Sequence, residues 1–249
     1  MTNPNKFRAF ADLHVPANPL ILVNAWDAGS AQAVAKSGAS AIATGSASVA
    51  MANGFGDGQE LPMDFALANA KRIVDAVDLP VTVDFEGAYS TDPDKGARNV
   101  AALKASGAVG CNFEDQVVGG DGIHPLDQHV RRIEAIRRAA GDDFFINART
   151  DLFLKAADHG DALIGEVIDR GKAFADAGAS GFFVPRLADP RQIERVVREV
   201  PLPLNVIAFP GAPPKSDWAA AGVARISHGP FPHRALMAQL EEAARTAIS

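Results

Sequence analysis

One short sequence pattern, called here the repeated phrase, occurs four times along the chain, and it constrains the fold more than any other feature. Each copy runs from small helix-forming residues through a glycine into an apolar stretch: AKSGASAIAT, KASGAVGCNF, ADAGASGFFV and AAAGVARIS. The four glycines are typical of the left-handed residue that ends a helix at little steric cost; they are Gly38, Gly107, Gly178 and Gly222. The phrase therefore predicts the order helix, turn, strand at four places.

Other apolar stretches are introduced by Leu-Pro, as in DLPVTVDFE and PLPLNVIAF, or stand alone between polar segments. Together with the four glycine-led stretches they predict eight strands, at residues 20–25, 41–47, 80–86, 109–115, 144–150, 181–187, 203–209 and 223–228. Helical stretches separate them. Asp189-Pro190 and Asp92-Pro93 each predict a capped helix start, because proline suits the first helical position.

Regular alternation of strands with crossover-length helices is typical of an all-parallel sheet, and eight units predict an α/β fold closed as a (β/α)8 TIM barrel. The length of 249 residues and the hydrophobic content of 47% suit a single domain, residues 1–249. An open doubly wound sheet is the alternative. That fold favours a G-x-G-x-x-G turn after the first strand, where this chain has NAWDAGSAQ.

Composition limits the partners of the chain. The formal net charge is -6, and the lysines and arginines are scattered, which argues against binding nucleic acid or an anionic membrane. The single cysteine, Cys111, excludes an internal disulfide framework, and its place within a predicted strand favours a core role. The first residues lack a signal-peptide pattern, so we expect a cytoplasmic protein with small-molecule partners.

Two predicted strands end in acidic residues, Asp84 and Glu86 in one case and Glu114 in the next. The carboxyl ends of all strands share one rim of a barrel, so these acids converge in space. Carboxylates suit Mg²⁺ or Mn²⁺, and Arg149, at the following strand end, suits a substrate carboxylate. The alternative is that an acid such as Asp84 or Glu114 caps a helix or pairs with Arg149.

A metal at this rim would polarise a carbonyl oxygen of the substrate. Stabilising the enolate beside that carbonyl is what C–C cleavage or decarboxylation of an α-keto acid requires. The charge layout therefore predicts a reaction class as well as a metal.

Six segments together resemble the isocitrate lyase and phosphoenolpyruvate mutase superfamily, over nearly the whole chain. They are NAWDAGSA (24–31), TGSASVA (44–50), NGFGDG (53–58), VDFEGAY (83–89), NFEDQ (112–116) and INARTD (146–151). The resemblance implies an α-keto-acid enzyme on a modified barrel with Mg²⁺. It also implies a homo-oligomer, a dimer or tetramer, in which the last helix is exchanged between subunits.

The same resemblance implies roles for individual residues. Asp84, Glu86 and Glu114 would form the metal shell, directly or through waters, and the family's D-x-D becomes Asp84-Phe85-Glu86 here. Asp57 would approach the reacting centre. The resemblance also implies a set of substrate contacts: Trp26, Ser46, Ala47, Arg149, Arg186 and Asn205.

The segment after the fourth strand separates the subfamilies. Lyases of the isocitrate and methylisocitrate type carry a K-(K/R)-C-G-H loop there, whereas this chain reads QVVGGDGIHPLD (116–127). The lysine and asparagine of phosphonate enzymes are missing as well. The glycines favour a mobile lid, and His124 within it is a candidate proton-transfer group, although a loop histidine is also often solvated.

We therefore predict a Mg²⁺-dependent lyase or decarboxylase that cleaves a C–C bond of a small α-keto or 2-hydroxy di- or tricarboxylic acid. Oxaloacetate-type decarboxylation and a retro-aldol cleavage giving pyruvate are the concrete forms. Phosphonate chemistry, of the mutase or hydrolase type, is the first alternative. A barrel that binds a carboxylate metabolite without turning it over is the second.

Overall fold

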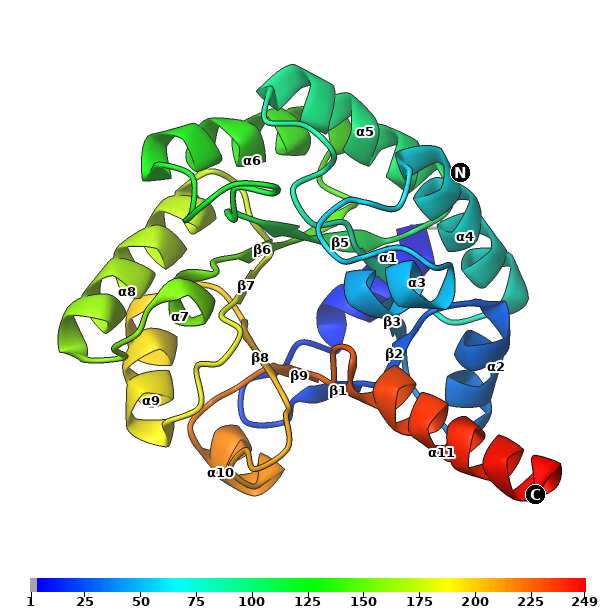
Figure 1. Ribbon diagram of the computed structural model, residues 1–249. Coiled ribbons are helices and arrows are strands. Elements are labelled where there is room, and N and C mark those ends of the chain that lie inside the picture. Colours follow the sequence, from blue (N-terminus) through cyan, green and yellow to red (C-terminus); the bar gives the residue numbers. More distant parts are fainter. Residues whose placement is uncertain (1–3) are drawn as a thin grey trace.

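The computed structural model describes residues 4–249, which form one parallel sheet surrounded by helices (Figure 1). The strands are β1 (Leu20–Leu22), β2 (Asn24–Ala25), β3 (Ile42–Thr44), β4 (Val81–Asp84), β5 (Gly110–Glu114), β6 (Phe145–Arg149), β7 (Gly181–Phe183), β8 (Leu204–Ile207) and β9 (Arg225–Ser227). They pair in the order β1-β9-β8-β7-β6-β5-β4-β3-β2. Each neighbouring pair is parallel.

The seam that closes the barrel lies between β1 and β2. β1 pairs with β9 and β2 pairs with β3, so both ends of the sheet belong to one stretch of chain. The predicted modified TIM barrel is confirmed, but the single strand expected at residues 20–25 is two segments separated by Val23. The interruption has a physical reason: the stretch must change partners as the twisted sheet closes on itself.

Asn24 joins the two sides of this seam. Its Nδ2 donates to the Thr44 carbonyl at 2.7 Å. Its Oδ1 accepts from the backbone N–H groups of His228 at 2.9 Å and Gly229 at 2.8 Å. The side chain is 4% exposed, so these bonds satisfy polar atoms that burial would otherwise leave unpaired.

The helices form the outer layer. They are α1 (Pro4–Asp12), α2 (Ala28–Lys36), α3 (Ser46–Ala52), α4 (Met63–Ala76), α5 (Pro93–Ala105), α6 (Leu126–Ala140), α7 (Leu152–Lys155), α8 (Asp161–Asp176), α9 (Pro190–Glu199), α10 (Lys215–Ala220) and α11 (Phe231–Ile248). Figure 1 shows α11 extending away from the barrel. Within residues 4–249, no helix is both long enough and apolar enough to cross a membrane.

The helix boundaries follow the local signals in the sequence. The four glycines of the repeated phrase have φ of 92°, 99°, 94° and 92°, as a helix-ending left-handed residue requires. The Asp92 side chain accepts from the N–H of Lys95 at the start of α5, and the Asp189 side chain accepts from that of Arg191 at the start of α9. Local chemistry thus determines where these helices begin and end.

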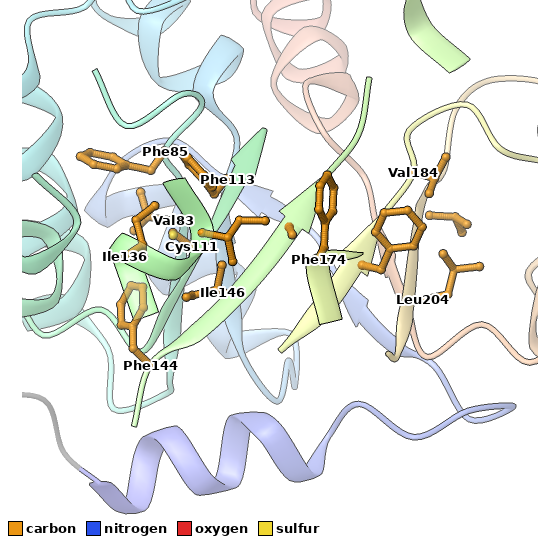
Figure 2. Packing of buried hydrophobic residues seen from close by; sticks show 14 of the residues in the cluster. Val83, Phe85, Cys111, Phe113, Ile136, Phe144, Ile146, Phe174, Val184 and Leu204 are labelled. Atoms are coloured by element: carbon orange, nitrogen blue, oxygen red, sulfur yellow. The ribbon is translucent and has the colours of Figure 1, made fainter. Parts of the chain in front are cut away.

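The main core lies between the sheet and its helices. Figure 2 shows Cys111 among Val83, Ile136 and Ile146, and its exposed fraction is 0%. Burial raises the pKa of the Cys111 thiol to about 12, so the thiolate is disfavoured. Below the strands, α1 covers the other end of the barrel, where the Phe10 ring packs edge-on against Phe145 at 5.3 Å between ring centres.

We predict that Gly110→Ala destabilises the barrel. A Cβ at this position would lie 2.5 Å from the Phe145 carbonyl oxygen on the neighbouring strand, which cannot move aside independently. Overpacking of this kind costs about 1–3 kcal/mol of unfolding free energy, measured by chemical denaturation.

Gly165→Ala, within α8, is the matched control because its Cβ would meet nothing within 4 Å. It should raise stability by about 0.5–1 kcal/mol. A Gly110→Ala variant as stable as the wild type would contradict the close strand contact.

Candidate active site

Asp84, at the end of β4, is held from one side only. Its Oδ2 accepts from the backbone N–H of Ser46 at 3.2 Å and from the Ser46 hydroxyl at 3.1 Å. The backbone N–H of Asp84 donates to Thr44 Oγ1 at 3.0 Å. Its other oxygen, Oδ1, is buried and has no hydrogen-bond partner among residues 4–249. A buried carboxylate oxygen without a partner is poised to bind a cation.

Glu86 is buried next to the loop that follows α3. Its Oε1 accepts from the backbone N–H groups of Gly58 at 3.0 Å and Gln59 at 2.9 Å. Burial raises the pKa of Glu86 to about 7, and the charges of Asp84 and Asp57 add to this shift. The pKa of Asp57 is raised as well, first by partial burial and then by Asp84. Negative charge is therefore crowded at this part of the rim.

Arg149 opposes that negative charge on the neighbouring strands. Its Nη1 lies 2.9 Å from Glu114 Oε2, and β5 and β6 place these two residues side by side. Its Nε and Nη2 donate to the two Asp151 carboxylate oxygens at 2.6 and 3.0 Å. Burial raises the pKa of Glu114 well above its usual value, while Arg149 acts in the opposite direction. The guanidinium is thus already paired with two acids of the chain, which the sequence left open.

The three predicted metal residues, Asp84, Glu86 and Glu114, are not equivalent. Among residues 4–249, no three acidic, histidine or cysteine side chains are arranged to enclose a metal ion by themselves. Asp84 has a free oxygen, whereas Glu86 binds loop amides and Glu114 binds Arg149. Mg²⁺ commonly keeps several waters and takes only one or two carboxylates. The residues fit such an ion: Asp84 would hold it directly, and the two glutamates would contact its waters.

A cavity of about 450 Å³ opens beside Asp84 at this rim. Five of the residues predicted for the site line it together with Asp84, namely Ser46, Ala47, Asp57, Arg149 and Arg186. Arg186 has a φ of 68°, a strained conformation for a residue other than glycine. The barrel rim therefore brings most of the predicted residues to one cavity.

Five predicted residues lie outside the lining of this cavity: Glu86 and Glu114, described above, and Trp26, Asn205 and His124. The Trp26 ring packs edge-on against His233 at 4.9 Å between ring centres. The Asn205 amide lies inside the barrel, where it donates to the Arg225 carbonyl at 3.1 Å. His124 is 5% exposed, and its backbone N–H donates to a carbonyl next to β5. The geometry does not bring the last three side chains together with Asp84.

The structure also adds residues that sequence reasoning missed. Arg234, in the first turn of α11, lines the cavity with Phe209 and Phe231. The loop after the last strand of a barrel reaches the same rim as the others, and that rule was the available signal. Gln59 is the second residue that the sequence did not indicate. Its contacts arise only when the loop between α3 and α4 is folded.

Enzymes built on parallel barrels carry their active sites at this rim, so the acids, cations and cavity found here are an arrangement typical of a barrel enzyme. The chain belongs to the phosphoenolpyruvate phosphomutase family, whose model matches residues 10–248. It is 31% identical to the 2-methylisocitrate lyase of Escherichia coli K12 over 218 residues, which cover 83% of this chain and 71% of that one.

Solved structures share the fold over almost the whole chain. A Burkholderia cenocepacia J2315 protein proposed to be a phosphonomutase has a TM-score of 0.95 and 43% identity, covering 98% of this chain and 99% of its own. Phosphonopyruvate hydrolase, solved with oxalate and Mg²⁺, has a TM-score of 0.84 and 23% identity, covering 98% of this chain and 87% of its own. The matched proteins thus include a carbon-carbon lyase and enzymes of phosphonate chemistry.

We predict that Arg149→Met destabilises the fold, because it leaves Glu114 and Asp151 buried without their cation. Breaking a buried ion pair from one side costs about 3–5 kcal/mol, measurable by chemical denaturation. Adding Glu114→Gln should recover part of this loss, since the amide carries no charge. Full stability of the single variant would show that the ion pairs do not hold the rim.

Proposed function

We propose that this protein is a Mg²⁺-dependent lyase acting on a small α-keto or 2-hydroxy di- or tricarboxylic acid. The observation that carries the proposal is the buried, unpartnered Oδ1 of Asp84 beside the cavity at the rim. The opposite oxygen is fixed by Ser46, so the free one has a defined direction. The Mg²⁺ bound by phosphonopyruvate hydrolase, which shares the fold, supports this assignment.

The cationic side of the cavity indicates an acidic substrate. Arg186 and Arg234 both line it, and neither forms an ion pair with another residue in the described part of the chain. Arg149 adds a positive charge although its donors are taken by Glu114 and Asp151. A substrate with one carboxylate on the ion held by Asp84 and another on Arg186 and Arg234 would balance the charges of the cavity.

In this proposal each group of the chain has a separate task. Bound Mg²⁺ would supply the positive charge that stabilises the enolate formed when the C–C bond breaks. Ser46 orients Asp84, and the chain beside Ala47 forms the wall on which the keto end rests. Asp57, the acid of the neighbouring loop, is the proton-transfer group, because it lines the cavity together with Asp84 and Ser46.

Phosphonate chemistry is the second candidate. The phosphonomutase assignment of the Burkholderia protein, at 43% identity, favours it. Both candidates use an enolpyruvate fragment, so the same anchor at Asp84 serves either one. The substrate decides between them.

The test is product formation from oxaloacetate, 2-methylisocitrate, isocitrate, dimethylmalate and phosphonopyruvate, with Mg²⁺ or with EDTA and against enzyme-free blanks. One substrate should give metal-dependent turnover, and Asp84→Asn should lower it by at least about 100-fold. Asp75→Asn, which changes an exposed acid paired with Lys71, is the control and should leave the rate unchanged. No turnover of any substrate would favour the carboxylate-binding barrel.

We further propose that α11 packs against a second copy of the chain. This helix lies mostly outside the barrel, and it exposes 47% of Leu236, 41% of Met237 and 60% of Leu240. Apolar side chains in such a row favour burial against another surface. Exchange of this helix between subunits would bury them.

Leu240→Lys should therefore weaken self-association, measured by light scattering during size-exclusion chromatography. Burying one leucine contributes about 1.5–3 kcal/mol, so we expect at least a roughly tenfold rise in the dissociation constant. Glu242→Gln on the same helix is the control and should leave the mass unchanged. A wild-type monomer at all concentrations would refute this packing.

A further inference from the structure

The loop between α3 and α4 is bound to the segment after β4 by two side chains, Glu86 and Gln59. Each side chain accepts hydrogen bonds from the backbone of the other segment. Glu86 Oε1 accepts from the backbone N–H groups of Gly58 and Gln59. In the orientation that satisfies its amide, the Gln59 side-chain oxygen accepts from the N–H of Gly87 at 2.8 Å and of Tyr89 at 3.1 Å. Each segment thus supplies one acceptor for two backbone donors of the other.

The backbone at this junction is strained on both sides. Four of the six non-glycine residues with positive φ in residues 4–249 belong to it: Gln59 (63°), Glu86 (51°), Ala88 (56°) and Tyr89 (55°). Such conformations cost about 1–3 kcal/mol each and persist only where surrounding contacts impose them. Their concentration beside the cavity indicates a function for the arrangement.

Buried side chains from two helices hold the β4 side of the junction in place. Arg132 of α6 donates through Nη2 to the Gly87 carbonyl at 2.7 Å and to the Ser90 carbonyl at 3.0 Å. Asn99 of α5 donates to the Ala88 carbonyl at 2.8 Å. The segment after β4 is therefore a rigid base, and the loop is the part that it holds.

The contacts at this junction fix the backbone next to Asp57. Asp57 directly precedes Gly58, whose N–H is bound by Glu86, so the peptide that follows the acid is fixed. Glu86 is 6% exposed, and its Oε1 accepts from the N–H groups of both Gly58 and Gln59. Only its second oxygen is left to face the waters of an ion. Its carboxylate is thus committed to the loop.

We propose that Glu86 and Gln59 form a reciprocal clamp that positions Asp57 over the cavity, with Glu86 serving the loop rather than binding the metal ion directly. The inference rests on the proposed function, which assigns Asp57 to proton transfer. It assigns to Glu86 and Gln59 the role of positioning residues, because they act through Asp57.

The test compares Gln59→Met, Glu86→Gln and Glu86→Leu with the wild type, and Glu60→Gln as the control. Glu60 lies in the same loop, but within residues 4–249 it accepts a hydrogen bond only from the Gly56 N–H. Three quantities are measured on the full chain: hydrogen exchange of the Gly58 and Gln59 amides, Mn²⁺ affinity, and the steady-state constants for the substrate found above. Thermal unfolding checks that each variant is folded.

We expect Gln59→Met and Glu86→Leu to speed exchange of these amides at least tenfold and to lower kcat by about 10–100-fold with little change in KM. Glu86→Gln keeps an acceptor oxygen, so it should restore slow exchange and most of kcat. Mn²⁺ affinity should stay within about threefold in Gln59→Met, which does not face the ion, and in Glu86→Gln it should fall less than in Asp84→Asn. Glu60→Gln should match the wild type throughout.

Three results would overturn the clamp. Unchanged exchange in Gln59→Met would show that the loop is held by other contacts. A loss of Mn²⁺ affinity in Glu86→Gln as large as that in Asp84→Asn would make Glu86 a direct metal ligand. A loosened loop with unchanged kcat would separate the clamp from Asp57. Failure of the proposed function would instead appear as absent turnover in the wild type, and the exchange and Mn²⁺ results would still decide whether the clamp exists.

Discussion

Closure of the sheet at the β1–β2 seam is the constraint on which the rest of the structure depends. Asn24 satisfies buried backbone groups on both sides of that seam. Because the closed sheet is all parallel, every strand ends at the same rim, and side chains far apart in the sequence meet there. Asp84, Glu114 and Arg149 are neighbours for this reason, and the cavity forms where their strands end.

The charged groups at the rim differ in what they contact. Glu114 and Asp151 pair with Arg149, and the loop amides bind one oxygen of Glu86, so these contacts fix the shape of the site. Among the carboxylates of residues 4–249, Asp84 alone keeps a buried oxygen without a hydrogen-bond partner. Arg186 and Arg234 line the same cavity, and neither forms an ion pair within residues 4–249. An ion at Asp84 and an acid on the arginines would complete the balance of charge.

Features governed by local chemistry or by the barrel rule could be predicted from the sequence. The helix-ending glycines, the capped helices after Asp92 and Asp189, and the convergence of the rim acids are of this kind. Side-chain partners could not be predicted, since they depend on register and loop shape. The pairing of Arg149 with Asp151, the clamp at Gln59 and the place of Trp26 outside the cavity lining all follow from such details.

The most direct test of the account is a Mn²⁺ titration of the wild type and of Asp84→Asn, followed by electron paramagnetic resonance without substrate. Asparagine keeps an oxygen for the Ser46 donors, so the variant should remain folded. The account predicts one Mn²⁺ site per chain, with affinity at least about tenfold weaker in the variant. Equal affinity in the two proteins, or no site in the wild type, would contradict the central place given to Asp84.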